Sequence, residues 1–227
     1  MGLLSTTQIL SYLARALVML IVIPVHEAAH AFVSAKLGDT TAKDAGRLTL
    51  NPLAHFDPIG ALCMIVAGFG WAKPVGVNPA RFKNPKAGMA LSAAAGPVSN
   101  LLLAFVATIV YKLVLFFYPA LPGGIFSDLL YLFTLYMVLM NVSLAVFNLI
   151  PLPPLDGSRM LLVFLPRRLY FKVMQYERYI FFAMAALLLL GVFDRPLALV
   201  NNWVLNLLLK LTGFVDLLLR AASGVSV

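Results

Sequence analysis

Long apolar stretches are the feature of this sequence that most restricts its fold. Hydrophobic residues make up 62% of the 227 residues and charged residues only 11%, whereas a soluble domain carries about 25% charged residues. Because a bilayer offers no hydrogen-bond partners to the backbone, such stretches cross it as helices. The first stretch lacks a basic start and a small-residue cleavage site, which favours a retained helix over a cleaved signal. The sequence therefore predicts an integral membrane protein.

The apolar stretches divide the chain into expected elements. Helices are predicted over residues 8–37, 85–117, 127–149, a short stretch from about 157, 169–192 and 197–220. The last carries several polar residues, so whether it spans the membrane stays open. Residues 44–52 and 73–79 predict short strands, and 59–71 is too short to cross as a helix, which indicates a re-entrant segment. The expected fold class is an all-α polytopic membrane protein with about five to six membrane helices and a short re-entrant, partly β segment after the first helix.

The basic residues predict the orientation of the chain in the membrane. Seven lie between residues 36 and 86 and five between 159 and 178, while residues 1–14 and 118–127 contain none. Positive charge collects on the cytosolic side of membrane proteins, so the two basic regions are expected there and the N-terminus outside. This placement also accounts for the formal charge of +8, and we therefore expect no nucleic-acid partner.

One short motif carries metal-binding chemistry. His26, Glu27 and His30 form the pattern H-E-x-x-H near the end of the first predicted helix. Residues four apart share a helix face, so the two imidazoles can bind one metal ion beside a carboxylate. A third protein ligand would complete a catalytic zinc site that keeps one position for water. Glu27 could then take the proton of that water. The alternative is a pair of buried histidines in a helix bundle, but ionisable residues within a membrane are costly and usually functional.

The third ligand and other polar residues of the site have alternative interpretations. Asp156 follows the proline-rich residues 151–154; it could point back into the bundle as a metal ligand or cap the next helix. His55 and Asp57 could line the active site or stabilise a polar turn. Asn100 belongs to the small-residue stretch 93–100, which favours close helix packing, and its amide could also bond near the site.

The motifs together resemble the site-2 protease family of intramembrane zinc metalloproteases, in particular its compact prokaryotic branch without PDZ or CBS domains. The resemblance covers about residues 20–160 and rests on five motifs, in the family's order: HEAAH (26–30), NPLAHFDPIG (51–60), GWAKPVGVNP (70–79), AAAGPVSN (93–100) and NLIPLPPLDG (148–157). An extra leading helix found in some relatives is missing here.

The resemblance implies both an activity and a ligand set. One Zn²⁺ per chain would be held by His26, His30 and Asp156, with Glu27 as general base and Asn148 near the substrate or transition state. Asn148 or His55 could stabilise the oxyanion. The partners implied are membrane-spanning protein substrates and the lipid bilayer; the sequence does not reveal an oligomeric state.

The expected protein is a site-2-type zinc metalloendopeptidase that cleaves membrane-spanning substrates in or near the bilayer. We expect one membrane-embedded metalloprotease domain over residues 1–227, with a catalytic core at about 8–160 and C-terminal helices at about 169–220. The expected location is a prokaryotic cell membrane, with the active site toward the cytosol. A metal carrier is the main rival, but a carrier does not need a carboxylate beside its first ligand. A scaffold that had lost catalysis would be expected to lack part of the His-Glu-His-Asp set, which is complete here.

Overall fold

The structure is a computed structural model that describes residues 5–55, 57–58, 73–166, 169, 172–173 and 175–223. Within these ranges the chain is helical and contains no strand. The predicted re-entrant segment 59–71 lies outside the described residues.

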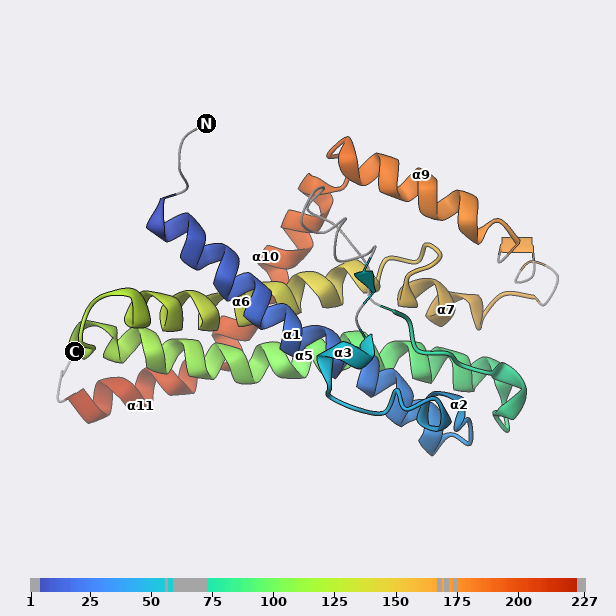
Figure 1. Ribbon diagram of the computed structural model, residues 1–227, viewed down its shortest axis with the longest axis horizontal. Helices are drawn as coiled ribbons and strands as arrows, with labels where there is room; N and C mark the ends of the chain where they lie inside the picture. The colour runs from blue at the N-terminus through green and yellow to red at the C-terminus, as the bar shows by residue number, and fades with distance from the viewer. Residues whose placement is uncertain are drawn as a thin grey trace.

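Three long helices form the body of the molecule (Figure 1). They are α1 (Thr6–Lys36), α5 (Pro85–Phe117) and α6 (Ile125–Asn148), and all three are long and apolar enough to cross a membrane. The first residues of α1 and α5 are set by local capping interactions. Ser5 and Gln8 form a capping box at the start of α1, and Asn84 caps α5 ahead of Pro85. The first three long helices predicted from the sequence are confirmed within a few residues, and all three are candidate membrane spans.

The long helices pack around a small core and expose apolar side chains outward. α5 and α6 are joined by the short helix η2 (Tyr118–Ala120) and lie side by side, and α1 crosses both. One core cluster consists of Ala104, Val142, Val146 and Leu208. Large side chains such as Leu20, Leu102 and Val106 are exposed, as expected of helices whose outer surface contacts lipid. The composition and these helices together identify an integral membrane protein.

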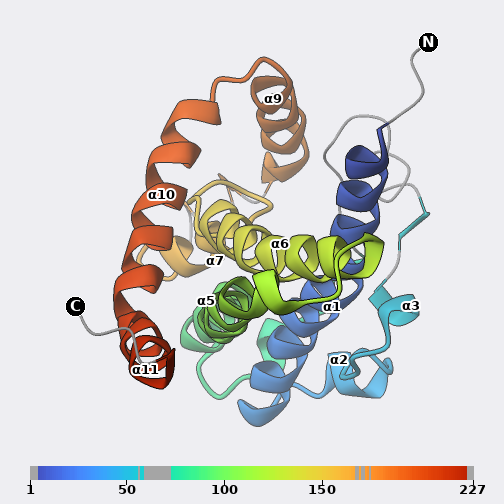
Figure 2. The same ribbon diagram turned by 90° about the vertical axis from the view of Figure 1, so that its left-hand side faces the viewer.

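The C-terminal third is more broken than the sequence predicted. It contains α7 (Asp156–Leu162), α9 (Glu177–Leu189), α10 (Asp194–Leu211) and α11 (Gly213–Ser223). α9 and α10 form a pair bent by 85°, so the described residues hold three candidate spans, or four if this pair is one broken span. That is fewer than the five to six expected, because α9 and α11 are too short to cross a bilayer. In an end-on view, α1 lies on one side of α6 and α10 on the other (Figure 2).

The predicted helix 197–220 is interrupted at Thr212, which separates α10 from α11. Gly213 follows the break, and glycine weakens a helix interior. Lys112 of α5 donates through Nζ to the carbonyls of Leu209 and Thr212, at 3.1 and 3.2 Å, and pairs with Asp216 at 2.6 Å. These bonds satisfy carbonyls that a continuous helix would have used, so contacts with α5 stabilise the break.

The strand predictions for 44–52 and 73–79 were wrong for the described residues. The structure instead has α2 (Thr41–Asp44), α3 (Pro52–His55) and η1 (Pro79–Arg81). Pro52 and Pro79 are the first residues of α3 and η1, where the missing proline N–H costs nothing. The alternation of Thr and Leu had indicated a strand, but short-range capping and turns determine the local structure here. The first helix ends near residue 37 as predicted, and Gly38, directly after its C-cap Leu37, has a φ of +108°.

Candidate metal centre

Two imidazoles and one carboxylate meet inside the helix bundle. His26 and His30 come from α1, one turn apart, and Asp156 is the first residue of α7. The two Nε2 atoms lie 3.0 Å apart, and Oδ2 of Asp156 lies 3.3 Å from Nε2 of His26 and 3.2 Å from Nε2 of His30. All three residues are buried. Among the described residues, they form the one group of three or more metal-binding side chains with converging ligand atoms.

The spacing of the three donor atoms fits a tetrahedral metal site. Bonds of about 2.0–2.1 Å to zinc place two ligand atoms of a tetrahedron about 3.3 Å apart. The observed triangle has sides of 3.0, 3.2 and 3.3 Å. Oδ2 of Asp156 is buried without a hydrogen-bond partner, which is costly unless a cation occupies the centre. Nitrogen and carboxylate donors with one open position are the ligand set of a catalytic zinc site.

The proline-rich turn after α6 delivers Asp156 to the two histidines. α6 ends at Asn148, and residues 149–155 form turns before α7 begins. A Cβ added to Gly157 would lie less than 3.0 Å from the carbonyl oxygen of Leu149, so only glycine permits this close return. The N-cap of α7 is Leu155, and the Asp156 carboxylate faces the histidines. The Asp156 side chain therefore does not cap α7, which was the alternative that the sequence left open.

α5 packs against the other edge of both imidazoles. Nδ1 of His30 lies 2.7 Å from the carbonyl oxygen of Ser92, and Nδ1 of His26 lies 3.1 Å from the amide of Asn100. Between them, Gly96 leaves no room for a side chain, because an added Cβ would lie less than 3.0 Å from both rings. Both interpretations of residues 93–100 are thus correct: the small residues allow close packing, and Asn100 bonds near the site.

Glu27 is held by a segment that the sequence analysis did not connect with it. Its Oε2 accepts a bond of 3.1 Å from the backbone N–H of Val75. Asp39 holds the segment 73–78 in place, because its Oδ2 accepts a hydrogen bond of 2.7 Å from the N–H of Asn78. Oδ1 of Asp39 accepts from the N–H and hydroxyl of Thr41. Asp39 lies just beyond the end of the first predicted helix, and no local signal in the sequence indicated its contact with Asn78.

These bonds also determine the charge state of Asp39. Burial alone would raise the pKa of its carboxyl, but the bonds from Thr41 and Asn78 and the nearby Arg81 guanidinium hold that pKa below its ordinary value of 3.8. Asp39 is therefore ionised at neutral pH, as its three hydrogen-bond donors require.

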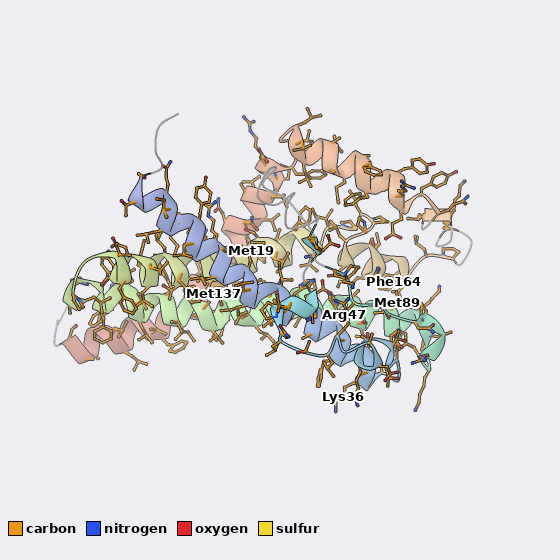
Figure 3. The ribbon with its side chains drawn as sticks, in the orientation of Figure 1. Met19, Lys36, Arg47, Met89, Met137 and Phe164 are labelled. Atoms are coloured by element: carbon orange, nitrogen blue, oxygen red, sulfur yellow. The ribbon has the colours of Figure 1, made fainter. Side chains whose placement is uncertain are left out.

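A cavity of about 1030 Å³ opens beside the metal-binding group. Its wall includes His26, Glu27, His30 and Asp156, together with apolar side chains from several helices. Met19 of α1 and Met89 of α5, both labelled in Figure 3, belong to this wall. Asn148 also lines the cavity, and its Nδ2 donates to the carbonyl of Leu144 at 3.0 Å.

His55 lies outside the group formed by His26, His30 and Asp156. It is buried at the end of α3, and its Nε2 lies 3.0 Å from the carbonyl oxygen of Thr49. It belongs neither to the metal-binding group nor to the cavity wall among the described residues. This position gives no support to the oxyanion role offered for His55 as an alternative to Asn148. The described Asp57 lies two residues further along the chain and is also absent from the cavity wall.

A buried His-His-Asp group beside a glutamate, inside a bundle of apolar helices, defines a membrane-embedded metallopeptidase. The model of Peptidase family M50 matches residues 14–191. The chain belongs to this family, that of the site-2 proteases, and is a metalloendopeptidase.

Two relatives agree with this assignment. The chain is 42% identical over 178 residues to "Putative zinc metalloprotease YwhC" of Bacillus subtilis, covering 78% of each chain. It is 32% identical over 142 residues to "Putative zinc metalloprotease Rip2" of Mycolicibacterium smegmatis, covering 58% of this chain and 49% of that relative. No solved structure matches the chain significantly.

Proposed function

We propose that the protein is a zinc-dependent intramembrane endopeptidase that cleaves membrane-spanning protein substrates in or near the bilayer. The observation that carries this proposal is the triangle of His26, His30 and Asp156, which lies at the wall of a large cavity with Glu27 beside it. One Zn²⁺ per chain would be held by these three residues. The names of both relatives as zinc metalloproteases support the choice of metal.

Glu27 acts as the general base in this proposal. When bound, zinc supplies the Lewis acidity that polarises the scissile carbonyl. Glu27 takes a proton from the attacking water and later gives it to the leaving amine. The N–H of Val75 holds the Glu27 carboxylate against segment 73–78, so the base has a fixed position before substrate enters. Asn148, on the same cavity wall, is our candidate for binding the substrate or the oxyanion, after its amide leaves the carbonyl of Leu144.

We further propose that the active site faces the cytosolic side of a prokaryotic cell membrane. α2, the start of α5 and α7 gather at one end of the bundle, and the loop around η2 lies at the other (Figure 1). Lys36, in the last turn of α1, and Arg159, in α7, belong to the two basic regions 36–86 and 159–178, and the positive-inside rule orients these regions toward the cytosol. The bacterial relatives support a prokaryotic membrane.

The chain is proposed to act as one membrane-embedded domain. The catalytic core, about residues 8–160, contains every residue assigned a role above. α10 packs onto that core through Leu208, which contacts the cluster around Ala104 and Val142. The helices at about 169–220 would complete the cavity wall, since residues such as Phe181 and Leu197 line it.

The test is cleavage of a panel of single-pass membrane segments by the purified full chain in detergent, with and without a zinc chelator. Glu27→Gln is the matched control, because the amide keeps the size of the side chain but cannot accept a proton. We expect cleavage only by the zinc-loaded parent protein, and a variant that keeps its zinc but loses activity by at least about a hundredfold, the contribution typical of a general base. A fully active Glu27→Gln protein would refute the mechanism. Zinc flux into proteoliposomes without cleavage would favour a carrier.

A further inference from the structure

The contact between α1 and α5 has a regular register around the metal-binding group. His26, His30 and Ser34 lie one turn apart on α1, and Asn100, Gly96 and Ser92 lie one turn apart on α5, in the opposite direction. Asn100 meets His26 at 3.1 Å, and the carbonyl oxygen of Ser92 meets His30 at 2.7 Å. The hydroxyls of Ser34 and Ser92 lie 2.6 Å apart. Every one of these six residues is buried.

A histidine that binds metal through Nε2 needs a hydrogen-bond acceptor at Nδ1. Neutral imidazole carries one proton, so a free lone pair on Nε2 requires the proton to be on Nδ1. The acceptor fixes both the tautomer and the direction of the ring. His30 has such an acceptor, because the carbonyl of Ser92 cannot donate. Its Nε2 lone pair therefore points toward Asp156 and His26.

His26 has only Asn100 in that position. As the amide stands, Nδ2 faces Nδ1 of His26, and Oδ1 is buried without a partner. An Nδ2 donor would force the His26 proton onto Nε2, where it would point at the centre of the triangle. A half-turn of the amide exchanges its oxygen and nitrogen with little change in shape. Oδ1 then accepts from Nδ1–H, and the lone pair of Nε2 is free.

We propose that Asn100 is the positioning residue of His26, with its Oδ1 accepting the Nδ1 proton so that Nε2 faces the zinc site. The inference rests on the proposed zinc function and extends it to a residue that does not touch the metal. Asn100 thereby does for His26 what the Ser92 carbonyl does for His30. The difference is that the Ser92 contact uses the backbone, whereas the Asn100 contact uses a side chain and can be removed by substitution.

The test measures the zinc affinity of the full chain in detergent by competition with a chelating indicator. Asn100→Leu keeps the volume and removes the acceptor, while Asn100→Asp offers only acceptors. We expect Asn100→Leu to weaken zinc binding about 10–100-fold and Asn100→Asp to bind within about threefold of the parent or more tightly. Asn141→Leu is the control, because Asn141 is also fully buried with an unpartnered Oδ1 but bonds only to Met137 of its own helix. It should leave zinc affinity unchanged.

The variants Asn100→Leu and Asn100→Asp together distinguish the possible outcomes. Parent-like affinity in Asn100→Leu would overturn the inference while leaving the zinc enzyme intact. Weakening of Asn100→Asp by about tenfold or more would also overturn it, because a carboxylate can only accept, and this comparison stands even if the leucine variant does not fold. If the parent protein binds no zinc, the proposed function fails and the inference fails with it.

Discussion

Gly96 lies where α5 packs directly against the two histidines of the candidate metal site. A Cβ there would lie less than 3.0 Å from atoms of both His26 and His30, and both rings are already fixed by bonds at Nδ1. The absence of a side chain is therefore required by the geometry of the site and not by backbone conformation, since Gly96 lies within a regular helix.

Gly96→Ala is expected to reduce zinc affinity by at least about tenfold, comparable to the loss of a hydrogen-bonding partner of a ligand. The methyl group must push α5 away or turn an imidazole from the centre. Isothermal titration with zinc would measure the loss. Gly123→Ala is the control, because an added Cβ there meets nothing within 4 Å. Equal affinities in the two variants would show that the site tolerates the methyl group.

Imidazole is also a zinc ligand, so His55 is the rival of Asp156 for the third position on the metal. The structure brings only Asp156 to the two Nε2 atoms. We expect Asp156→Ala to lose stoichiometric zinc, because two imidazoles alone bind it weakly, and His55→Ala to keep it with reduced activity. Metal analysis of the purified variants decides the question. A His55→Ala protein without zinc would overturn the assignment.

At the scale of elements, the segment 73–78 connects the end of α1 to Glu27, the proposed general base. Val75 is buried against Ala31 and Ala42, its N–H bonds Glu27, and Asp39 fastens Asn78. The anionic side chain of Asp39, just beyond the end of α1, thus helps to hold the Glu27 side chain of the same helix in place, through a segment almost forty residues away. Asp39 is a positioning residue in this arrangement.

Asp39→Asn should lower activity while zinc content stays at one per chain, because the change loosens segment 73–78 and not the ligands. Its effect should also depend on pH. The folded pKa of Asp39 lies below the ordinary 3.8, so its stabilisation is complete above that value and is lost as the pH falls through the folded pKa. The temperature of thermal unfolding should therefore fall below about pH 4 more steeply in the parent than in Asp39→Asn. Parallel pH profiles would contradict the role of the Asp39 carboxylate.

At the scale of the whole molecule, the distribution of charge determines how the bundle sits in the membrane. Lys36 lies at the lower edge of the molecule in Figure 3, at the end of α1, and the chain between α5 and α6 contains no basic residue. The two ends of α5 therefore face different sides.

Cysteine labelling from each side of the membrane tests this orientation. In a Cys63→Ser background, a cysteine at Lys83 should react with an impermeant reagent from the cytosolic side, and one at Gly123 from the opposite side. The reason is the positive-inside rule, under which basic flanking residues stay in the cytosol. Labelling of position 123 from the cytosol would reject the topology.

Several features that depend on neighbouring residues were predictable from the sequence. The pair His26 and His30 follows from the helix period, and the three long helices follow from apolar runs with capping residues at their starts. The strands were mispredicted because alternation over a few residues is only a weak signal for a strand. The local hydrogen bonds of Asp39 and the helix starts at Pro52 and Pro79 determine the structure there instead. The break at Thr212 was missed because Lys112, a hundred residues away, stabilises it.

The sequence by itself determined the membrane setting, the long helices, and the pairing of two candidate metal ligands with the glutamate beside them, because each depends on the order of neighbouring residues. The tertiary structure alone brought Asp156 to the histidines, set Asn100 and Gly96 against their rings, and joined Glu27 to Val75. Those contacts depend on the register between helices and on the path of turns, which are set by packing over the whole bundle. Periodicity indicates which face of a helix carries a side chain, but only packing decides what that face meets.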